Sequence, residues 1–338
     1  QNEKYQIIKK IFENIISIPP MSKLIIALLA LTIVNAQQIH NVIYAQTGKF
    51  SVTWYNTGHE FETDNSKERT VHFIALFREP FDQVPQMEVG LYGFDLGFNN
   101  AGIYAEVDRV AKDGYDIKIT CPAGSICYNI AVDFIAYIEG QGYEHTSFSS
   151  SDFDEAQQNT WKSGANARYA TKTLTSSITE DTGVISFISG FQFGAGANIR
   201  LRTATQSVAN GEATLELGTW ADTKLLSFRI GVLFFKKSEK TDAFSLSSSK
   251  TGTLYTGHGF RDDVKKTENI PSQGAQFFVA FSHIDFINGH NYRVKHDHHH
   301  GENYLSTTFT TWYDTSIWRV VDAVLYTPII DHSWAVAM

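Results

Sequence analysis

Two short motifs place an arginine and a tryptophan at nearly the same spacing twice in the sequence. The pentad Thr-Trp-x-Asp-Thr occurs at residues 219–223 and again at 311–315, and an Asn-x-Arg triplet places Arg200 and Arg293 20 and 19 residues before the two Trp residues. Arginine presents planar, paired hydrogen-bond donors, and an aromatic ring covers an apolar ligand face. Together these residue types suit a ligand with hydroxyl groups around an apolar ring, such as a sugar.

The residues on both sides of the pentads alternate between apolar and polar types. Apolar side chains occupy every second position from 213 to 217 and from 228 to 232. Such alternation around a short polar turn predicts a β-hairpin with one buried face. Asp and Thr suit the turn because their side chains bond local backbone groups.

The remainder of the chain predicts an all-β fold. The sequence has 24 Gly but only 7 Pro, and 13% of its residues are aromatic. Short alternating segments end at Gly, Asn, Asp and Ser, and no capped helical stripe is evident after residue 36. The remaining length of about 300 residues exceeds one small sandwich, so two or three domains are expected.

An internal repeat favours three domains. We expect tandem small antiparallel β-sandwich domains at residues 37–140, 141–240 and 241–330, with a tail at 331–338 and linkers near 139–151 and 236–250. The strands of the three copies are expected at residues 89–96, 103–107, 114–120 and 131–137; at 185–193, 198–202, 213–220 and 230–235; and at 277–286, 291–295, 305–312 and 320–326.

The N-terminal residues have the pattern of an export signal. Met21-Ser-Lys23 precedes an apolar run at 24–34, and the small residue Ala36 follows. This pattern predicts a signal peptide at 21–36, an upstream lead at 1–20 outside the mature protein, and a secreted product without a membrane span. A buried N-terminal helix is the alternative.

Charge and cysteine usage narrow the function classes further. The formal net charge of −8 disfavours binding to nucleic acid, which requires a basic surface. Cys121 and Cys127 lie six residues apart, and no His is near them. In an oxidising compartment we expect a disulfide rather than a zinc site.

The repeats resemble H-type lectin domains, the family of the snail agglutinins and of the C-terminal domains of discoidins. The resemblance rests on the Asn-x-Arg strands, the Thr-Trp-x-Asp-Thr turns and Thr47-Gly48, which is similar to the Ser-Gly start of the family. It implies galactose- or N-acetylgalactosamine-type glycans or glycoproteins as partners. It also implies trimeric assembly, realised here as an intramolecular pseudo-trimer or a homo-oligomer.

The resemblance also assigns the sugar-binding residues. The third copy matches the family at Arg293, Trp312, Tyr313 and Trp318, whereas the second keeps Arg200 and Trp220 but has Ala221 and Leu226 in place of the polar and aromatic partners. The first copy has Gly102 at the Arg position and Cys121 at the Trp position, which implies a structural role. The alternative is that these arginines pair with neighbouring acids and that the Trp residues cap the sandwich.

Other chemistry is not indicated. The run at 296–300, which contains four His, is expected to be a solvated loop rather than a metal site, and we expect no metal and no cofactor. No hydrolase elbow, zinc-protease helix or nucleotide-binding glycine motif occurs, so an enzyme is not expected. The predicted function is a secreted lectin, and the alternative is an extracellular structural or adhesive coat protein built from degenerate lectin sandwiches.

Overall fold

The structure is a computed structural model, and it describes residues 45–53, 61, 65–98, 100–140, 142–237, 242–249, 260–268, 278–300, 305–312 and 318–327. These residues all belong to one compact unit. The predicted all-β class is confirmed, because the described residues form three antiparallel sheets. The predicted signal peptide and the lead before it lie outside the described residues. In the described residues, no helix is both long and apolar enough to cross a membrane.

We refer to residues 37–140, 141–240 and 241–330 as segments 1, 2 and 3. Segment 1 contains β1 (Ala45–Thr53), β2 (Arg69–Leu76), β3 (Gln86–Leu96), β4 (Gly102–Val110), β5 (Gly114–Cys121) and β6 (Cys127–Tyr137). Segment 2 contains β7 (Tyr143–Ser149), η1 (Ser150–Asp152), α4 (Glu155–Lys162), β8 (Arg168–Thr175), β9 (Thr182–Phe193), β10 (Ile199–Ala209), β11 (Glu212–Thr219) and β12 (Leu225–Lys236). Segment 3 contains β13 (Asp242–Ser249), β14 (Phe260–Glu268), β15 (Phe278–Phe286), β16 (Tyr292–His300), β17 (Leu305–Trp312) and β18 (Trp318–Thr327).

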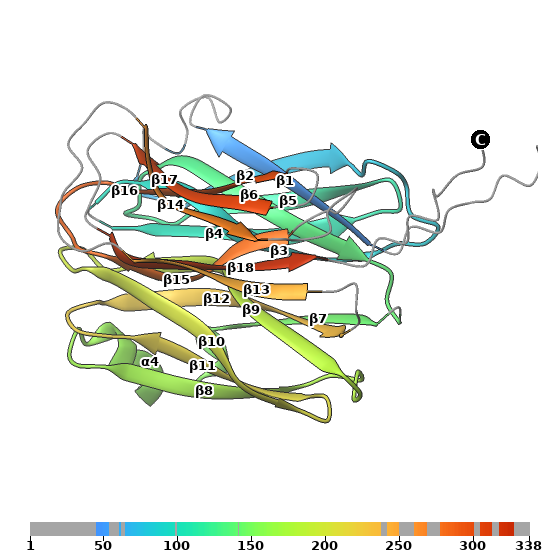
Figure 1. Cartoon of the computed structure of the whole chain (residues 1–338). Coiled ribbons are helices and arrows are strands. Elements are labelled where there is room, and N and C mark those ends of the chain that lie inside the picture. Colours follow the sequence, from blue (N-terminus) through green and yellow to red (C-terminus); the bar gives the residue numbers. More distant parts are fainter. Residues whose placement is uncertain are drawn as a thin grey trace, which may run out of the picture. The chain divides into compact units, whose positions relative to one another are not determined.

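Each of the three described sheets combines strands from two segments (Figure 1). Sheet I has the order β1-β6-β3-β16-β17-β14, sheet II the order β2-β5-β4-β9-β12-β7, and sheet III the order β13-β18-β15-β10-β11-β8. We call the strand pair at which two segments meet a seam. The three seams are β3–β16, β4–β9 and β10–β15. Segment 1 therefore pairs with segments 2 and 3, which also pair with each other.

The burial pattern explains which strands lie in the middle of the sheets. Every residue of β3 after Gln86 is buried, as expected for a strand covered on both faces, whereas the edge strands β2 and β8 alternate between covered and exposed residues. Strands β3, β9 and β15, one from each segment, contact one another. A Cβ atom on Gly90 of β3 would lie 2.4 Å from the Cβ of Ala280, so the close approach of these strands requires glycine there.

The predicted hairpins at the pentads are wrong. The first pentad connects β11 in sheet III to β12 in sheet II, and the second connects β17 in sheet I to β18 in sheet III. Alternation predicts that each flanking strand has one buried face. It does not distinguish two strands that pair with each other from two strands that belong to different sheets, and here the strands belong to different sheets.

Two of the other sequence predictions also need correction. The predicted linkers at 139–151 and 236–250 contain strands β7 and β13, which pair with β12 and β18. A helix, α4, follows η1, although the sequence predicted none. Asp154 caps α4 by accepting a hydrogen bond from the Gln157 backbone, and Trp161 is its buried anchor, with its ring 5.1 Å from that of Phe228. With one buried residue, α4 has no apolar stripe that periodicity could reveal.

Candidate functional site

The seam between β3 and β16 brings Arg293 next to an aspartate of another segment. Arg293 is paired in register with Asp95 of segment 1. Its Nε lies 3.0 and 2.9 Å from the two carboxylate oxygens, and Nε1 of Trp312 donates to Oδ2 of the same carboxylate at 3.2 Å. The side chains of Arg293 and Asp95 are 12% and 11% exposed. Burial raises the pKa of Asp95, while the bonds from Arg293 and Trp312 act in the opposite direction.

The first Thr of each pentad fixes the turn to the arginine strand. The Thr311 hydroxyl donates to the carbonyl oxygen of Arg293 at 2.9 Å, and the Thr219 hydroxyl donates to that of Arg200 at 2.7 Å. These bonds place the following Trp beside the arginine side chain. The recurring spacing of arginine and pentad in the sequence therefore has a local structural cause.

The β10–β15 seam holds Arg200 between two acids. Arg200 donates from Nε to Asp285 at 3.0 Å and from Nη1 to Asp222 at 2.6 Å, and its side chain is 2% exposed. Burial acts to raise the pKa of Asp222, but the bonds from Arg200 and Asn198 outweigh it and lower the pKa. The Trp220 ring meets His283 edge to face at 5.3 Å. The alternative in which arginine pairs with neighbouring acids therefore describes Arg200 well.

The β4–β9 seam lacks both the arginine and the aspartate. Gly102 is paired with Gln192, and the Tyr104 hydroxyl is hydrogen-bonded to Ser227 nearby. The strand registers align Cys121 with Thr219 and Thr311, so Pro122 rather than Cys121 occupies the Trp position. The sequence analysis aligned the first copy with the other two one residue too early at this position, because the first copy has no Trp by which to set the alignment.

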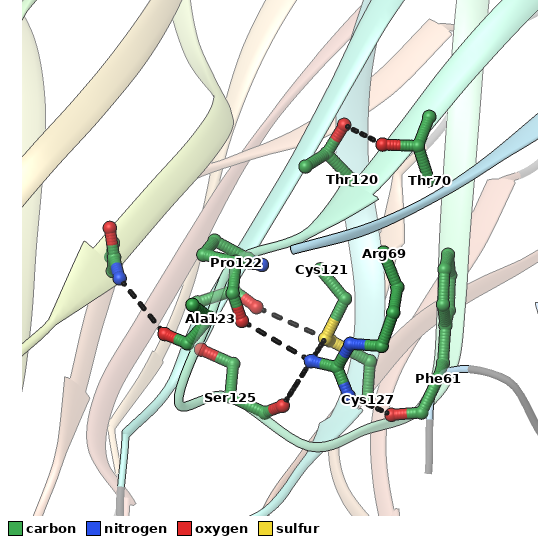
Figure 2. Close-up of a disulfide and its surroundings, with 11 residues drawn as sticks. Phe61, Arg69, Thr70, Thr120, Cys121, Pro122, Ala123, Ser125 and Cys127 are labelled. Carbon is green, nitrogen blue, oxygen red and sulfur yellow. Dashed lines mark hydrogen bonds between the residues drawn. A yellow bond between two sulfur atoms is a disulfide. The ribbon is translucent and has the colours of Figure 1, made fainter. Parts of the chain in front are cut away.

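The predicted disulfide is confirmed, and it connects two sheets. Cys121 ends β5 in sheet II, Cys127 begins β6 in sheet I, and their Cα atoms are 6.3 Å apart. Figure 2 shows the buried Arg69 beside the bridge. Arg69 donates to the carbonyl oxygens of Phe61, Pro122 and Ser125 at 2.9, 3.2 and 2.5 Å.

Arg69 belongs to a set of three arginines that the sequence analysis missed. Arg69, Arg168 and Arg261 are paired in register with Cys121, Thr219 and Thr311. Arg168 donates to the carbonyl oxygens of Ala221 and Thr223 at 3.2 and 2.8 Å, so it holds the pentad turn as Arg69 holds the disulfide loop. Arg168 and Arg261 are 93 residues apart, as are Arg200 and Arg293. This equal separation is the pattern in the sequence from which Arg168 and Arg261 could have been recognised as equivalent.

Of the other predicted site residues, Tyr313 lies outside the described residues. Trp318 begins β18 and is paired in register with Phe286, but its side chain is not among those described. The structure thus brings Arg293 and Trp312 together through Asp95, and Arg200 near Trp220. The predicted roles of Tyr313 and Trp318 in the site stay predictions.

The histidines do not form the predicted solvated loop. The run at 296–300 belongs to β16 and pairs with β17, and His296 is buried with its ring 5.0 Å from Phe309. Elsewhere, possible ligand atoms of His72, Asp108 and Asp116 lie within 4.8 Å of one another. Arg109 donates to Asp116 at 3.0 Å, so we interpret this cluster as a surface ion-pair network.

Comparison with known proteins supports the family resemblance for one part of the chain. Residues 75–137 match the family model of the H-type lectin domain. Neither a curated protein nor a solved structure matches the chain. The matched residues lie in segment 1, where Gly102 and Pro122 replace the Arg and Trp, so the match rests on the framework strands. An H-type lectin domain points to carbohydrate binding, which is a non-enzymatic role.

Proposed function

We propose that this protein is a secreted lectin that binds galactose- or N-acetylgalactosamine-type glycans at the seam between segments 3 and 1. The observation that carries the proposal is the cluster of Arg293, Asp95 and Trp312, in a chain that matches the H-type lectin domain. Arg293 would donate to sugar hydroxyls, and the Trp312 ring would cover the C–H face. Tyr313 and Trp318 would complete the site.

The proposal includes three copies of one unit within the chain, arranged as a pseudo-trimer. Its support is the repetition of strand order, because each segment gives its first, sixth and third strands to one sheet and its fourth, fifth and second strands to another. The seams repeat as well, with Arg293 opposite Asp95 and Arg200 opposite Asp285. Three sites of unequal quality would follow from the unequal residues at the three seams.

Export is the second part of the proposal. The predicted signal peptide at 21–36 would direct the chain out of the cell, and a disulfide is typical of proteins in oxidising compartments. The N-terminus of the exported protein, determined by sequencing, is expected at or near Gln37. Retention of Met21 in the exported protein would contradict this part.

A glycan array probed with the exported protein tests the proposed function. We expect binding to glycans with terminal galactose or N-acetylgalactosamine, competition by the free sugar, and loss of the signal in Arg293→Ala. The matched control is Arg202→Ala, because Arg202 lies on the surface strand face with 42% of its side chain exposed and pairs with Glu216. The proposal fails if the wild-type protein binds no glycan, or if both variants behave alike.

The structural or adhesive coat protein stays a second candidate. The complete burial of Arg200 between Asp285 and Asp222 favours it, because at that seam the lectin-like arginine joins two segments. A wild-type protein that fails on the array but assembles into ordered multimers would support this candidate.

A further inference from the structure

The geometry points to Asp95 as a positioning residue for the proposed saccharide site, so that segment 1 completes a site whose binding residues belong to segment 3. This inference rests on the proposed function. Segment 1 has Gly102 and Pro122 at its own Arg and Trp positions, and so lacks the residues for an equivalent site. It nevertheless supplies the carboxylate that contacts both Arg293 and Trp312.

One carboxylate fixes two side chains that would touch the sugar. Arg293 has a long side chain with several rotatable bonds, and the contacts of its Nε with both oxygens of Asp95 set the plane of the guanidinium group. Oδ2 also accepts from the Trp312 indole, which sets the orientation of the ring. Donor plane and ring face would therefore be arranged before a ligand arrives, which lowers the entropy cost of binding.

Burial makes these contacts stronger than surface ion pairs. With 11% of the Asp95 side chain and 12% of the Arg293 side chain exposed, water screens the pair weakly. A buried charge that loses its partner is costly, so each of these two side chains restrains the other. Asp95 itself is held by β3, a strand with buried residues on both faces.

The other two seams lack this shared carboxylate. At the β10–β15 seam, Arg200 contacts Asp285, but the Trp220 ring lies against His283 and its indole nitrogen makes no hydrogen bond to the described residues. At the β4–β9 seam, the neutral Gln192 faces Gly102. Among the described residues, the β3–β16 seam is thus where one carboxylate accepts hydrogen bonds from both the arginine and the tryptophan of the motif.

The test compares Asp95→Asn and Asp95→Ala with Asp133→Ala in the full-length protein. Asp133 is the matched control because it is also a buried aspartate of segment 1 that contacts segment 3, where its Oδ2 accepts from the Val279 backbone at 2.9 Å. Three quantities are measured: affinity for the strongest array glycan, thermal stability, and the indole N–H signal of Trp312 by nuclear magnetic resonance without ligand.

We expect glycan affinity to fall roughly 10- to 100-fold in Asp95→Ala and less in Asp95→Asn, because the amide oxygen still accepts from the indole. The Trp312 signal should shift in both Asp95 variants. Asp133→Ala should lower stability and keep the affinity of the wild type. Should Asp95→Ala fail to fold, Asp95→Asn provides the same comparison.

The inference is overturned, while the proposed function stands, if the Asp95 variants bind as tightly as the wild type or if the Trp312 signal does not move. An equal loss of affinity in Asp133→Ala also overturns it, since the effect would then come from a loosened seam. A wild-type protein that binds no glycan instead removes the proposed function, and the inference with it.

Discussion

Arg200 and Arg293 occupy equivalent strand positions, but they differ in how their charge is neutralised. Arg200 contacts Asp285 and Asp222 and is 2% exposed, whereas 12% of the Arg293 side chain is exposed and its Nε contacts Asp95. A fully buried guanidinium between two carboxylates contributes mainly to the integrity of the fold. Partial exposure next to a Trp is what a ligand-binding arginine requires.

The first prediction separates these two roles. Arg200→Ala leaves Asp285 buried without its arginine and should destabilise the protein by about 3–5 kcal/mol. Arg293→Ala should cost about 1.5–3 kcal/mol of glycan binding, roughly 10- to 100-fold in affinity. Denaturant unfolding and glycan titration of both variants check this. Equal losses of affinity in the two variants would show that the ranking of the two sites is wrong.

Motif spacing led us to group Arg293 with Trp312, and in the structure both side chains contact Asp95. Motif spacing could not identify Asp95, which is 198 residues before Arg293 in the sequence and belongs to another segment. No periodicity within one segment specifies which strand of another segment will pair with it. Arg69 escaped for a different reason, because an arginine that opens a strand has no apolar pattern of its own.

At the scale of elements, the connections between sheets contain the pentads, the disulfide and the carbonyl oxygens that bind buried arginines. The pentads and the disulfide loop all connect a strand of one sheet to a strand of another, and a buried arginine fills the Cys121–Cys127 loop and the first pentad turn. Burial of backbone carbonyl oxygens requires hydrogen-bond donors, and one guanidinium supplies several. This explains why arginine rather than lysine lies under both turns.

Replacement of the disulfide tests how much of this loop depends on the covalent bond. The double variant Cys121→Ala, Cys127→Ala should be less stable by about 2 kcal/mol, the value expected for so short a loop. Arg69→Lys should destabilise as well, by about 1–3 kcal/mol, because an ammonium cannot reach three carbonyl oxygens at once. Chemical denaturation gives both values. Full stability in Arg69→Lys would contradict the role given to the guanidinium.

The apolar alternation predicted the four inner strands of each segment but none of the edge strands of the sheets, β1, β2, β7, β8, β13 and β14. β7 and β13 were interpreted as linkers because their sequences are polar and rich in Ser. An edge strand needs one partner and little apolar surface, so it leaves a weak pattern in the sequence. In β7, Tyr143 and Phe148 are the buried residues, and their odd separation breaks the alternation.

At the scale of the whole molecule, each sheet continues from one segment into another, and buried groups gather where the segments meet. Asp133 of segment 1 accepts from the Val279 backbone of segment 3 at 2.9 Å and is fully buried. Glu88, in β3, is 3% exposed. Sequence alternation predicted that apolar residues would fill these strands, and it gave no reason for two carboxylates to lie among them.

The pH dependence of stability should report these two acids. Burial raises the pKa of Glu88 to about 7 and that of Asp133 to about 8. Both values lie above the ordinary carboxyl values of 4.5 and 3.8, so the folded state holds these protons more tightly. The resulting stability is lost progressively as pH rises above those ordinary values, and the loss is complete once pH has passed through about 7 to 8.

Thermal unfolding between about pH 5 and about pH 9 should show a falling melting temperature. Glu88→Gln should flatten the curve and recover on the order of 3 kcal/mol at the alkaline end. The exposed Glu139→Gln is the control and should leave the curve unchanged. A stability that rises through this range would contradict the assignment of these carboxyl groups.

The last prediction concerns a single segment expressed alone. Residues 141–240 contain two three-stranded half-sheets, β7-β12-β9 and β8-β11-β10, and in the full chain β9 and β10 each pair with a strand of another segment. Isolated, these two strands would expose unpaired backbone groups next to buried side chains such as Phe191 and Leu201. We therefore expect the isolated segment to self-associate, with copies pairing β9 to β10, or to remain unfolded when dilute.

Light scattering during size-exclusion chromatography, together with far-ultraviolet circular dichroism, distinguishes these states from a folded monomer. A monomer that unfolds cooperatively would show that strand pairing across the seams is dispensable, and the proposed pseudo-trimer would then be three independent domains.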